Sequence, residues 1–157
     1  MFQLSANRTI KLSIWDTAGQ EKYRAINKNF YTGSNGVLIC FDLTKPLEVE
    51  AIKSWVDEAK EHIGDECIIV MVGTKGDGAV DDATVKTLSK FAAENKLDFI
   101  QTSSLLGTNV YFAFESLIKT IDKQMEGRLG AENSFLTNGN LQRKDTDVSV
   151  SISGRCC

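Results

Sequence analysis

The sequence is short of several features that mark other protein classes. Its 157 residues include one proline and one histidine, and 18 basic and 21 acidic residues give a net charge of −3. No apolar run approaches the roughly 18 to 20 residues that span a bilayer. The start, MFQLSANRTIK, lacks the charged and apolar regions of a secretory signal. Because an excess of basic charge is also absent, a partner nucleic acid is not predicted. These absences predict a soluble, intracellular protein.

The remaining composition is that of a globular domain, with 42% hydrophobic and 25% charged residues. The pattern changes near Glu126. After it, the chain is rich in Ser, Asn, Asp, Thr and Gly and poor in periodic apolar positions. We therefore predict a folded body at residues 1–126 and a flexible tail at 127–157.

Four segments have the pattern of β-strands. Residues 9–15 alternate between apolar and polar side chains, as in a strand with one wetter face. Residues 36–43 and 67–73 are continuous apolar runs, which are typical of parallel strands buried on both faces. Residues 97–102 form a weaker example.

Helical periods lie between and after these strands, at residues 49–63, 85–92 and 110–125, and Pro46 precedes the first of them. An alternation of strand and helix predicts right-handed crossovers and a mostly parallel sheet covered on both sides, which is an α/β fold. In such sheets, ligands bind at the carboxyl ends of the strands. The residues that follow each strand are therefore the candidate site.

Polar residues do follow each strand, at 15–21, 42–44, 73–77 and 102–104. Each of these pieces alone is also typical of an ordinary turn, since Asp, Gly, Ser and Thr are common after strands. An assignment of function therefore has to rest on these four pieces taken together.

The combination is specific. WDTAGQE at 15–21, followed by YRAINKNFYTG, GVLICFDLT, GTKGD and QTSSLLGTNV in this order, resembles the Ras superfamily of small GTPases and, within it, the Rab branch. The resemblance implies the three-layer P-loop NTPase (Ras-like) fold, N-terminally incomplete. It implies that residues 1–126 are a partial small GTPase domain. It also implies a switch in vesicle trafficking that binds GTP or GDP with Mg²⁺.

The resemblance assigns roles to the stretch after the first predicted strand. Asp16 matches the aspartate that helps to hold Mg²⁺ on the phosphates, and Thr17 and Ala18 continue the nucleotide-binding stretch. The backbone of Gly19 approaches the γ-phosphate, where a side chain would interfere. Gln20 matches the glutamine that orients the attacking water, so it is the expected catalytic residue.

Recognition of the base is expected from two later loops. Asp77 matches the residue that accepts from the ring N1–H and the exocyclic amine of guanine, a pair of donors that adenine lacks. Lys75 is expected to lay its aliphatic stem along the base. Thr74 stands where most of the family has Asn, and Leu105 replaces the usual Lys. The loop that supports the base consists of Ser103, Ser104 and Leu105.

The phosphate-binding motif of the family is missing from these residues. A P-loop needs Gly-Lys followed by Ser or Thr, and none of the 12 glycines is followed by lysine. The strand that precedes this loop is central in the family's sheet, so its absence would leave two neighbouring strands unpaired. We expect the chain alone to bind GTP weakly and to hydrolyse it poorly.

Three interpretations stay open. The chain is an incomplete version of a normal Rab, a shortened protein that binds escort or effector proteins without GTP turnover, or an unrelated α/β module. The motifs argue against the third.

The last residues resemble the Rab ending. Cys156 and Cys157 match the cysteines that receive two geranylgeranyl groups, and two lipid chains suffice for stable attachment to a membrane. The implied partners are Rab escort protein, geranylgeranyl transferase and GDP dissociation inhibitor. Residues 148–152 alternate like a strand, and we interpret them as part of an extended tether.

Rab proteins also bind an exchange factor, a GTPase-activating protein and effectors. Trp15 and Phe30 match members of an aromatic cluster that contacts effectors, and Tyr23 and Arg24 fall in the matching second switch. The expected location is the cytoplasmic face of an endomembrane, with cycling through the cytosol.

Overall fold

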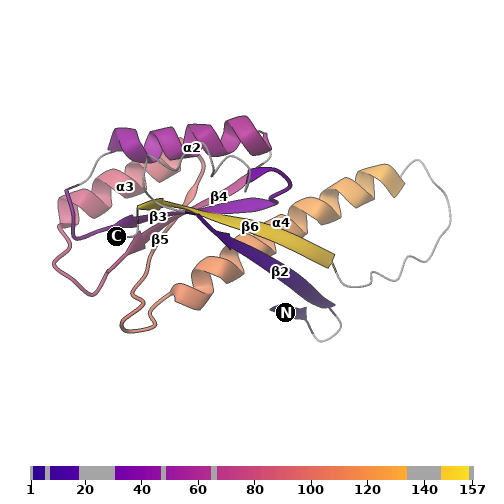
Figure 1. Ribbon diagram of the computed structural model, residues 1–157. Helices are drawn as coiled ribbons and strands as arrows, with labels where there is room; N and C mark the ends of the chain where they lie inside the picture. The colour runs from indigo at the N-terminus through magenta and orange to yellow at the C-terminus, as the bar shows by residue number, and fades with distance from the viewer. Residues whose placement is uncertain are drawn as a thin grey trace.

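The computed structural model describes residues 2–5, 8–17, 31–46, 49–64, 67–133 and 146–155 (Figure 1). The described elements, in chain order, are β1 (Phe2–Ser5), β2 (Arg8–Asp16), β3 (Gly36–Asp42), α2 (Val49–Ile63), β4 (Ile68–Thr74), α3 (Asp82–Glu94), β5 (Asp98–Gln101), α4 (Val110–Asn133) and β6 (Thr146–Arg155).

The strands form one sheet in the order β1-β2-β6-β3-β4-β5. β1 pairs with β2 in the antiparallel direction, and every other pairing is parallel. The four predicted strands correspond to β2, β3, β4 and β5, and the three predicted helices correspond to α2, α3 and α4. The predicted α/β fold with a mostly parallel sheet is therefore confirmed.

The sheet separates two helical layers, with α2 and α3 over one face and α4 over the other (Figure 1). The surroundings of β3 explain why its residues 36–41 are free of polar side chains. Val37 and Ile39 point into the layer under α2, whereas Leu38 and Cys40 point toward α4. Because successive side chains of a strand point to opposite faces, a strand buried on both faces has no polar positions.

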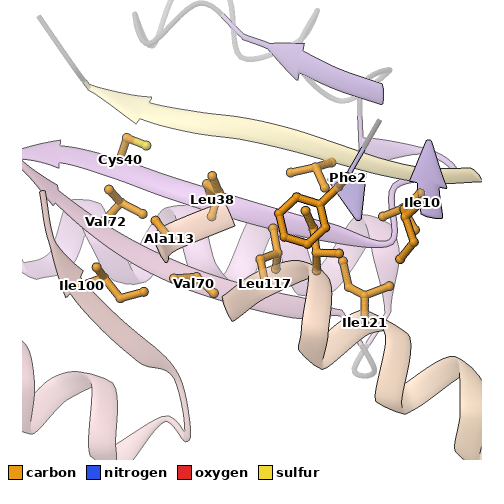
Figure 2. Close-up of a cluster of buried hydrophobic side chains, with 13 residues drawn as sticks. Phe2, Ile10, Leu38, Cys40, Val70, Val72, Ile100, Ala113, Leu117 and Ile121 are labelled. Carbon is orange, nitrogen blue, oxygen red and sulfur yellow. The ribbon is translucent and has the colours of Figure 1, made fainter. Parts of the chain in front are cut away.

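The layer between the sheet and α4 is the largest apolar cluster of the described residues. Side chains from β3, β4 and β5 point toward Ala113, Leu117 and Ile121 of α4, and Phe2 and Ile10 close one end of the cluster (Figure 2). Val148 and Val150 of β6 belong to the same cluster and are buried. The core therefore includes residues from both ends of the described chain.

β6 is the main difference from the sequence interpretation. Residues 148–152, which we interpreted as part of an extended tether, lie in the middle of the sheet between β2 and β3 (Figure 1). The expected gap between two unpaired strands is filled, since β6 is parallel to both neighbours. The alternation of apolar and small polar residues in β6 matches this position, where one face of the strand meets α4.

α4 also continues past the predicted boundary at Glu126 and ends at Asn133. Within the segment 127–157, the described residues 127–133 belong to α4 and the described residues 146–155 form β6. Both parts have regular secondary structure. Across the ranges given above, every helix is too short or too polar to cross a membrane.

Candidate functional site

Two loops lie side by side at the carboxyl edge of the sheet, one after β4 and one after β5. The backbone N–H of Gly76 donates to the carbonyl oxygen of Thr102 at 2.9 Å. The backbone N–H of Thr102 in turn donates to the carbonyl oxygen of Gly73 at 2.7 Å. A Cβ atom added to Gly76 would lie 3.2 Å from the Thr102 oxygen, so glycine permits this close approach. The predicted site at the strand ends therefore brings the segments GTKGD and TSSL together.

A carboxylate and a hydroxyl join the two loops. The buried hydroxyl of Ser103 donates to Oδ1 of Asp77, which is exposed at the surface. The same Ser103 Oγ accepts from the backbone N–H of Leu106 at 3.1 Å. Because Ser103 is fixed as both donor and acceptor, it holds the Asp77 carboxylate in one orientation at the edge of the sheet.

Lys75 lies two residues before Asp77 in the loop after β4, and an ion pair holds its head group. Its backbone has the left-handed φ of 59°, and its carbonyl oxygen accepts from the N–H of Gly78 at 2.9 Å. Its Nζ lies 2.8 Å from Oδ2 of Asp42, whose side chain is only 3% exposed, whereas that of Lys75 is 51% exposed. The ion pair fixes the head of Lys75, so that its aliphatic stem has a defined path along the loop.

Asp42 itself is surrounded by donors. Its Oδ1 accepts from the backbone N–H of Thr44 at 2.9 Å and from the Thr44 hydroxyl at 2.6 Å. The hydrogen bond from Lys75, followed by the one from the Thr44 hydroxyl, lowers the pKa of Asp42 from 3.8 to about 2. The sequence placed Asp42 at a strand end without assigning it a role. The signal was its position directly after an apolar run.

Thr74 lies within the site, but its hydrogen bonds stabilise the sheet. Its hydroxyl donates to the carbonyl oxygen of Phe41 at 3.0 Å, and its own carbonyl oxygen accepts from the N–H of Leu43 at 3.1 Å. These bonds tie the end of β4 to β3. The hydroxyl proton of Thr74 is therefore engaged within the protein.

Asp16 and Thr17 lie at the same edge of the sheet but away from the two loops. The end of β2 is separated from β4 by β6 and β3, which amounts to roughly 14 Å for three inter-strand spacings. The Asp16 side chain is exposed. Thr17 is buried, and both its N–H and its hydroxyl donate to the carbonyl oxygen of Ile152, at 3.1 and 2.7 Å. Thr17 therefore holds β6 in the sheet.

The remaining predicted positions divide into exposed and undescribed residues. Ser104 is exposed, and Leu105, at 81%, is more so. Trp15 lies on β2 and is 49% exposed. The positions outside the described residues are Ala18, Gly19, Gln20, Tyr23, Arg24, Phe30, Cys156 and Cys157.

The two loops and the end of β2 differ in the chemical groups that they present. At the two loops, Ser103 holds the Asp77 carboxylate, and Asp42 holds the head group of Lys75. By contrast, no group of three or more His, Cys, Asp or Glu side chains in the described ranges could hold a metal ion. Asp16 is a single exposed carboxylate at the end of β2.

Comparison with known proteins shows what the chain is similar to. The sequence profile of the Ras family matches residues 2–123. The chain is 32% identical to Ras-related protein RABA2a of Arabidopsis thaliana, over 96% of this chain and 72% of that protein. It is 38% identical to Ras-related protein rab-11.1 of Caenorhabditis elegans, again over 96% and 72%. It is 39% identical to GTP-binding protein ypt3 of Schizosaccharomyces pombe, over 78% of this chain and 58% of that protein.

Proposed function

Because the chain belongs to the Ras family, as a Rab-type small GTPase of the Ras superfamily, we propose that the loops after β4 and β5 bind the base of GTP or GDP. Ras-family GTPases in general bind guanine nucleotides with Mg²⁺. The observation that carries the proposal is the Asp77 carboxylate, held across the two loops by the buried hydroxyl of Ser103.

Selectivity for guanine follows from the chemistry of that carboxylate. Asp77 accepts hydrogen bonds from the N1–H and the exocyclic amine of guanine. Adenine presents an acceptor at N1, so the carboxylate would face a lone pair and lose both bonds. Lys75, whose head is tied to Asp42, lays its stem against the face of the base. Ser103 acts as a positioning residue for Asp77.

We expect these 157 residues to bind the phosphates of the nucleotide weakly, because they contain no Gly-Lys dipeptide. Asp16 remains the proposed Mg²⁺ ligand, and Gln20 the proposed residue that orients the attacking water. When bound, Mg²⁺ would neutralise phosphate charge. We expect weak GTP binding and slow hydrolysis, and submicromolar affinity with steady turnover would contradict that expectation.

The proposed cellular role is that of a switch in intracellular vesicle trafficking on the cytoplasmic face of an endomembrane. In this proposal, Cys156 and Cys157 carry two geranylgeranyl groups. The partners are escort protein and transferase, GDP dissociation inhibitor, exchange factor, GTPase-activating protein and effectors. Support comes from the Rab relatives and from the half-exposed Trp15 on β2.

An alternative role is a non-catalytic protein that binds escort or effector proteins without GTP turnover. The absence of Gly-Lys from these residues favours it. A single-turnover assay with GTP distinguishes the roles, because only the switch converts GTP to GDP faster than a Gln20→Leu variant.

The base site is tested by exchanging one oxygen of Asp77 for a nitrogen. Asp77→Asn places an N–H donor opposite the 2-position of the base, which suits the 2-oxo group of xanthine and opposes the amine of guanine. We expect wild type to prefer GDP over xanthosine diphosphate by roughly tenfold or more, and the variant to reverse this preference.

Titrations with GDP and with xanthosine diphosphate, followed by the amide NMR shifts of the two loops, measure both affinities even when binding is weak. The matched control is Asp57→Asn, which removes the same charge from the exposed side of α2. A wild-type chain without base preference, or a preference that Asp77→Asn leaves unchanged, would contradict the proposed site.

A further inference from the structure

β6 is enclosed by strands on both sides. Along β2, residues from Ile10 to Asp16 lie opposite Thr146 to Ile152, and along β3, residues from Gly36 to Phe41 lie opposite Val150 to Arg155 (Figure 1). Only residues 153–155 are paired on the β3 side alone. The backbone of β6 is therefore engaged as far as Arg155.

Residues outside β6 hold it at three points, through both backbone and side-chain groups. Asn35 exchanges two bonds with Ser149, because its N–H donates to the Ser149 oxygen at 2.8 Å and its Oδ1 accepts from the Ser149 N–H at 2.9 Å. The hydroxyls of Ser34 and Ser151 share a buried hydrogen bond of 2.7 Å. Thr17 donates twice to Ile152. These polar contacts are specific to this strand in this register.

The position of β6 limits access to the residues that follow it. Cys156 and Cys157 follow directly in the sequence after Arg155, whose backbone is paired with Phe41 of β3. An enzyme that modifies a cysteine thiol needs access to the sulfur and to the chain beside it. Neighbouring strands already occupy both edges of that chain at residues 150–152 and one edge at residues 153–155.

We propose that β6 is a removable strand, and that its release from between β2 and β3 precedes the lipidation of Cys156 and Cys157. This inference rests on the lipidation part of the proposed function. In the lipidation step, the thiol sulfur forms a bond to C1 of an isoprenoid diphosphate and the C1–O bond breaks. Diphosphate leaves with the electron pair, and the thiol proton passes to solvent.

The test weakens the hold on β6 without altering the tail that the transferase binds. Asn35→Ala removes the acceptor for the Ser149 N–H, and Ser34→Ala removes the hydrogen bond between the hydroxyls of residues 34 and 151. Asn35→Asp keeps an acceptor oxygen and serves as the conservative variant. Ser89→Ala on the exposed side of α3 is the matched control.

Two rates are measured on each full-length variant. One is the hydrogen exchange of the β6 amides, with the β4 amides as the measure of global unfolding. The other is the initial rate of mass gain with geranylgeranyl transferase, escort protein and geranylgeranyl diphosphate. If release is a rapid equilibrium before modification, both rates rise by the same factor, roughly fivefold to tenfold for Asn35→Ala and Ser34→Ala. Asn35→Asp and Ser89→Ala should stay near wild type.

Three results would overturn the inference. If lipidation stays at the wild-type rate while exchange of β6 rises, release does not precede modification, although lipidation itself stands. If no variant gains isoprenoid even where β6 exchanges rapidly, the lipidation proposal fails as well. If the β6 amides of wild type exchange as fast as those of an unfolded peptide, β6 is not held in the sheet.

Discussion

At the scale of single residues, the Asp42–Lys75 pair links the site to the acid stability of the fold. The folded protein holds the pKa of Asp42 at about 2, compared with an ordinary value of 3.8, chiefly through hydrogen bonds from Lys75 and Thr44. A carboxyl with a lowered pKa stabilises the fold only when it is ionised. The contribution is therefore complete above about pH 4 and is lost as the pH falls from about 4 to 2.

Replacing Lys75 with methionine should reveal this dependence. The stem is retained and the cation is lost, so we expect the free energy of unfolding at pH 7 to fall by about 1 kcal/mol. Near pH 2 the difference from wild type should become small, because Asp42 is then about half protonated in the folded wild type and largely protonated in the variant. Urea unfolding at a series of pH values measures the effect, with Lys90→Met, from an exposed pair with Glu94, as the control. A difference that stays constant from pH 7 to 2 would contradict the assignment.

Short sequence motifs predicted some residues of the site but not their partners. Lys75, Asp77 and Ser103 were predicted site residues because they occur in short family motifs, and the structure brings them to adjacent loops. The partner of Lys75 was not predicted. Asp42 lies 33 positions earlier in the chain, and only the pairing of β3 with β4 makes the two residues neighbours.

At the scale of elements, the start of α3 fixes the end of the loop that carries Asp77. Asp81 is the N-cap, with φ −80° and ψ 129°, and its Oδ2 accepts from the N–H of Thr84 at 3.1 Å. The cap satisfies a backbone donor that the first helical turn leaves unpaired. The loop after β4 is therefore held at both ends, by the sheet and by this cap.

Removal of the cap should cost a measurable amount of stability. For Asp81→Ala, we expect the free energy of unfolding to fall by about 1 kcal/mol, whereas Asp81→Asn, which keeps a capping oxygen, should lose only a few tenths. Urea unfolding at neutral pH measures both variants. If Asn destabilises as much as Ala, the negative charge near the helix N-terminus, and not the hydrogen bond, is responsible.

Prediction from sequence succeeded for elements whose pattern is sufficient to define them. The apolar runs of β3 and β4 and the amphipathic period of α2 were recognised because burial on both faces, or on one stripe, repeats locally. β6 has a recognisable alternation too, but its partners are residues 10–16 and 36–41. A local pattern indicates that a segment can be a strand, and it does not indicate between which strands it lies.

At the scale of the whole molecule, β6 is expected to contribute to global stability. Val150 is 0% exposed and packs in the cluster under α4. Val150→Ala should lower the free energy of unfolding by about 2 kcal/mol, through lost apolar burial and the cavity left behind.

The fluorescence of buried Trp55 during urea unfolding reports this change at a position far from the substitution in sequence. Val49→Ala, at the partly exposed start of α2, should change stability by less than about 0.5 kcal/mol. No effect of Val150→Ala would mean that residues 146–155 lie outside the cooperative unit, as the tether interpretation assumed.

The position of β6 has a consequence for how the protein is made. β3 ends at Asp42 and β6 begins at Thr146, so 103 residues are synthesised between two strands that lie side by side. At about 5–20 residues per second, a ribosome needs roughly 5 to 20 s for that stretch. During this interval the nascent chain presents the facing edges of β2 and β3, with their apolar sides, to any chaperone or neighbouring polypeptide. The centre of the sheet is the last part of it to be translated.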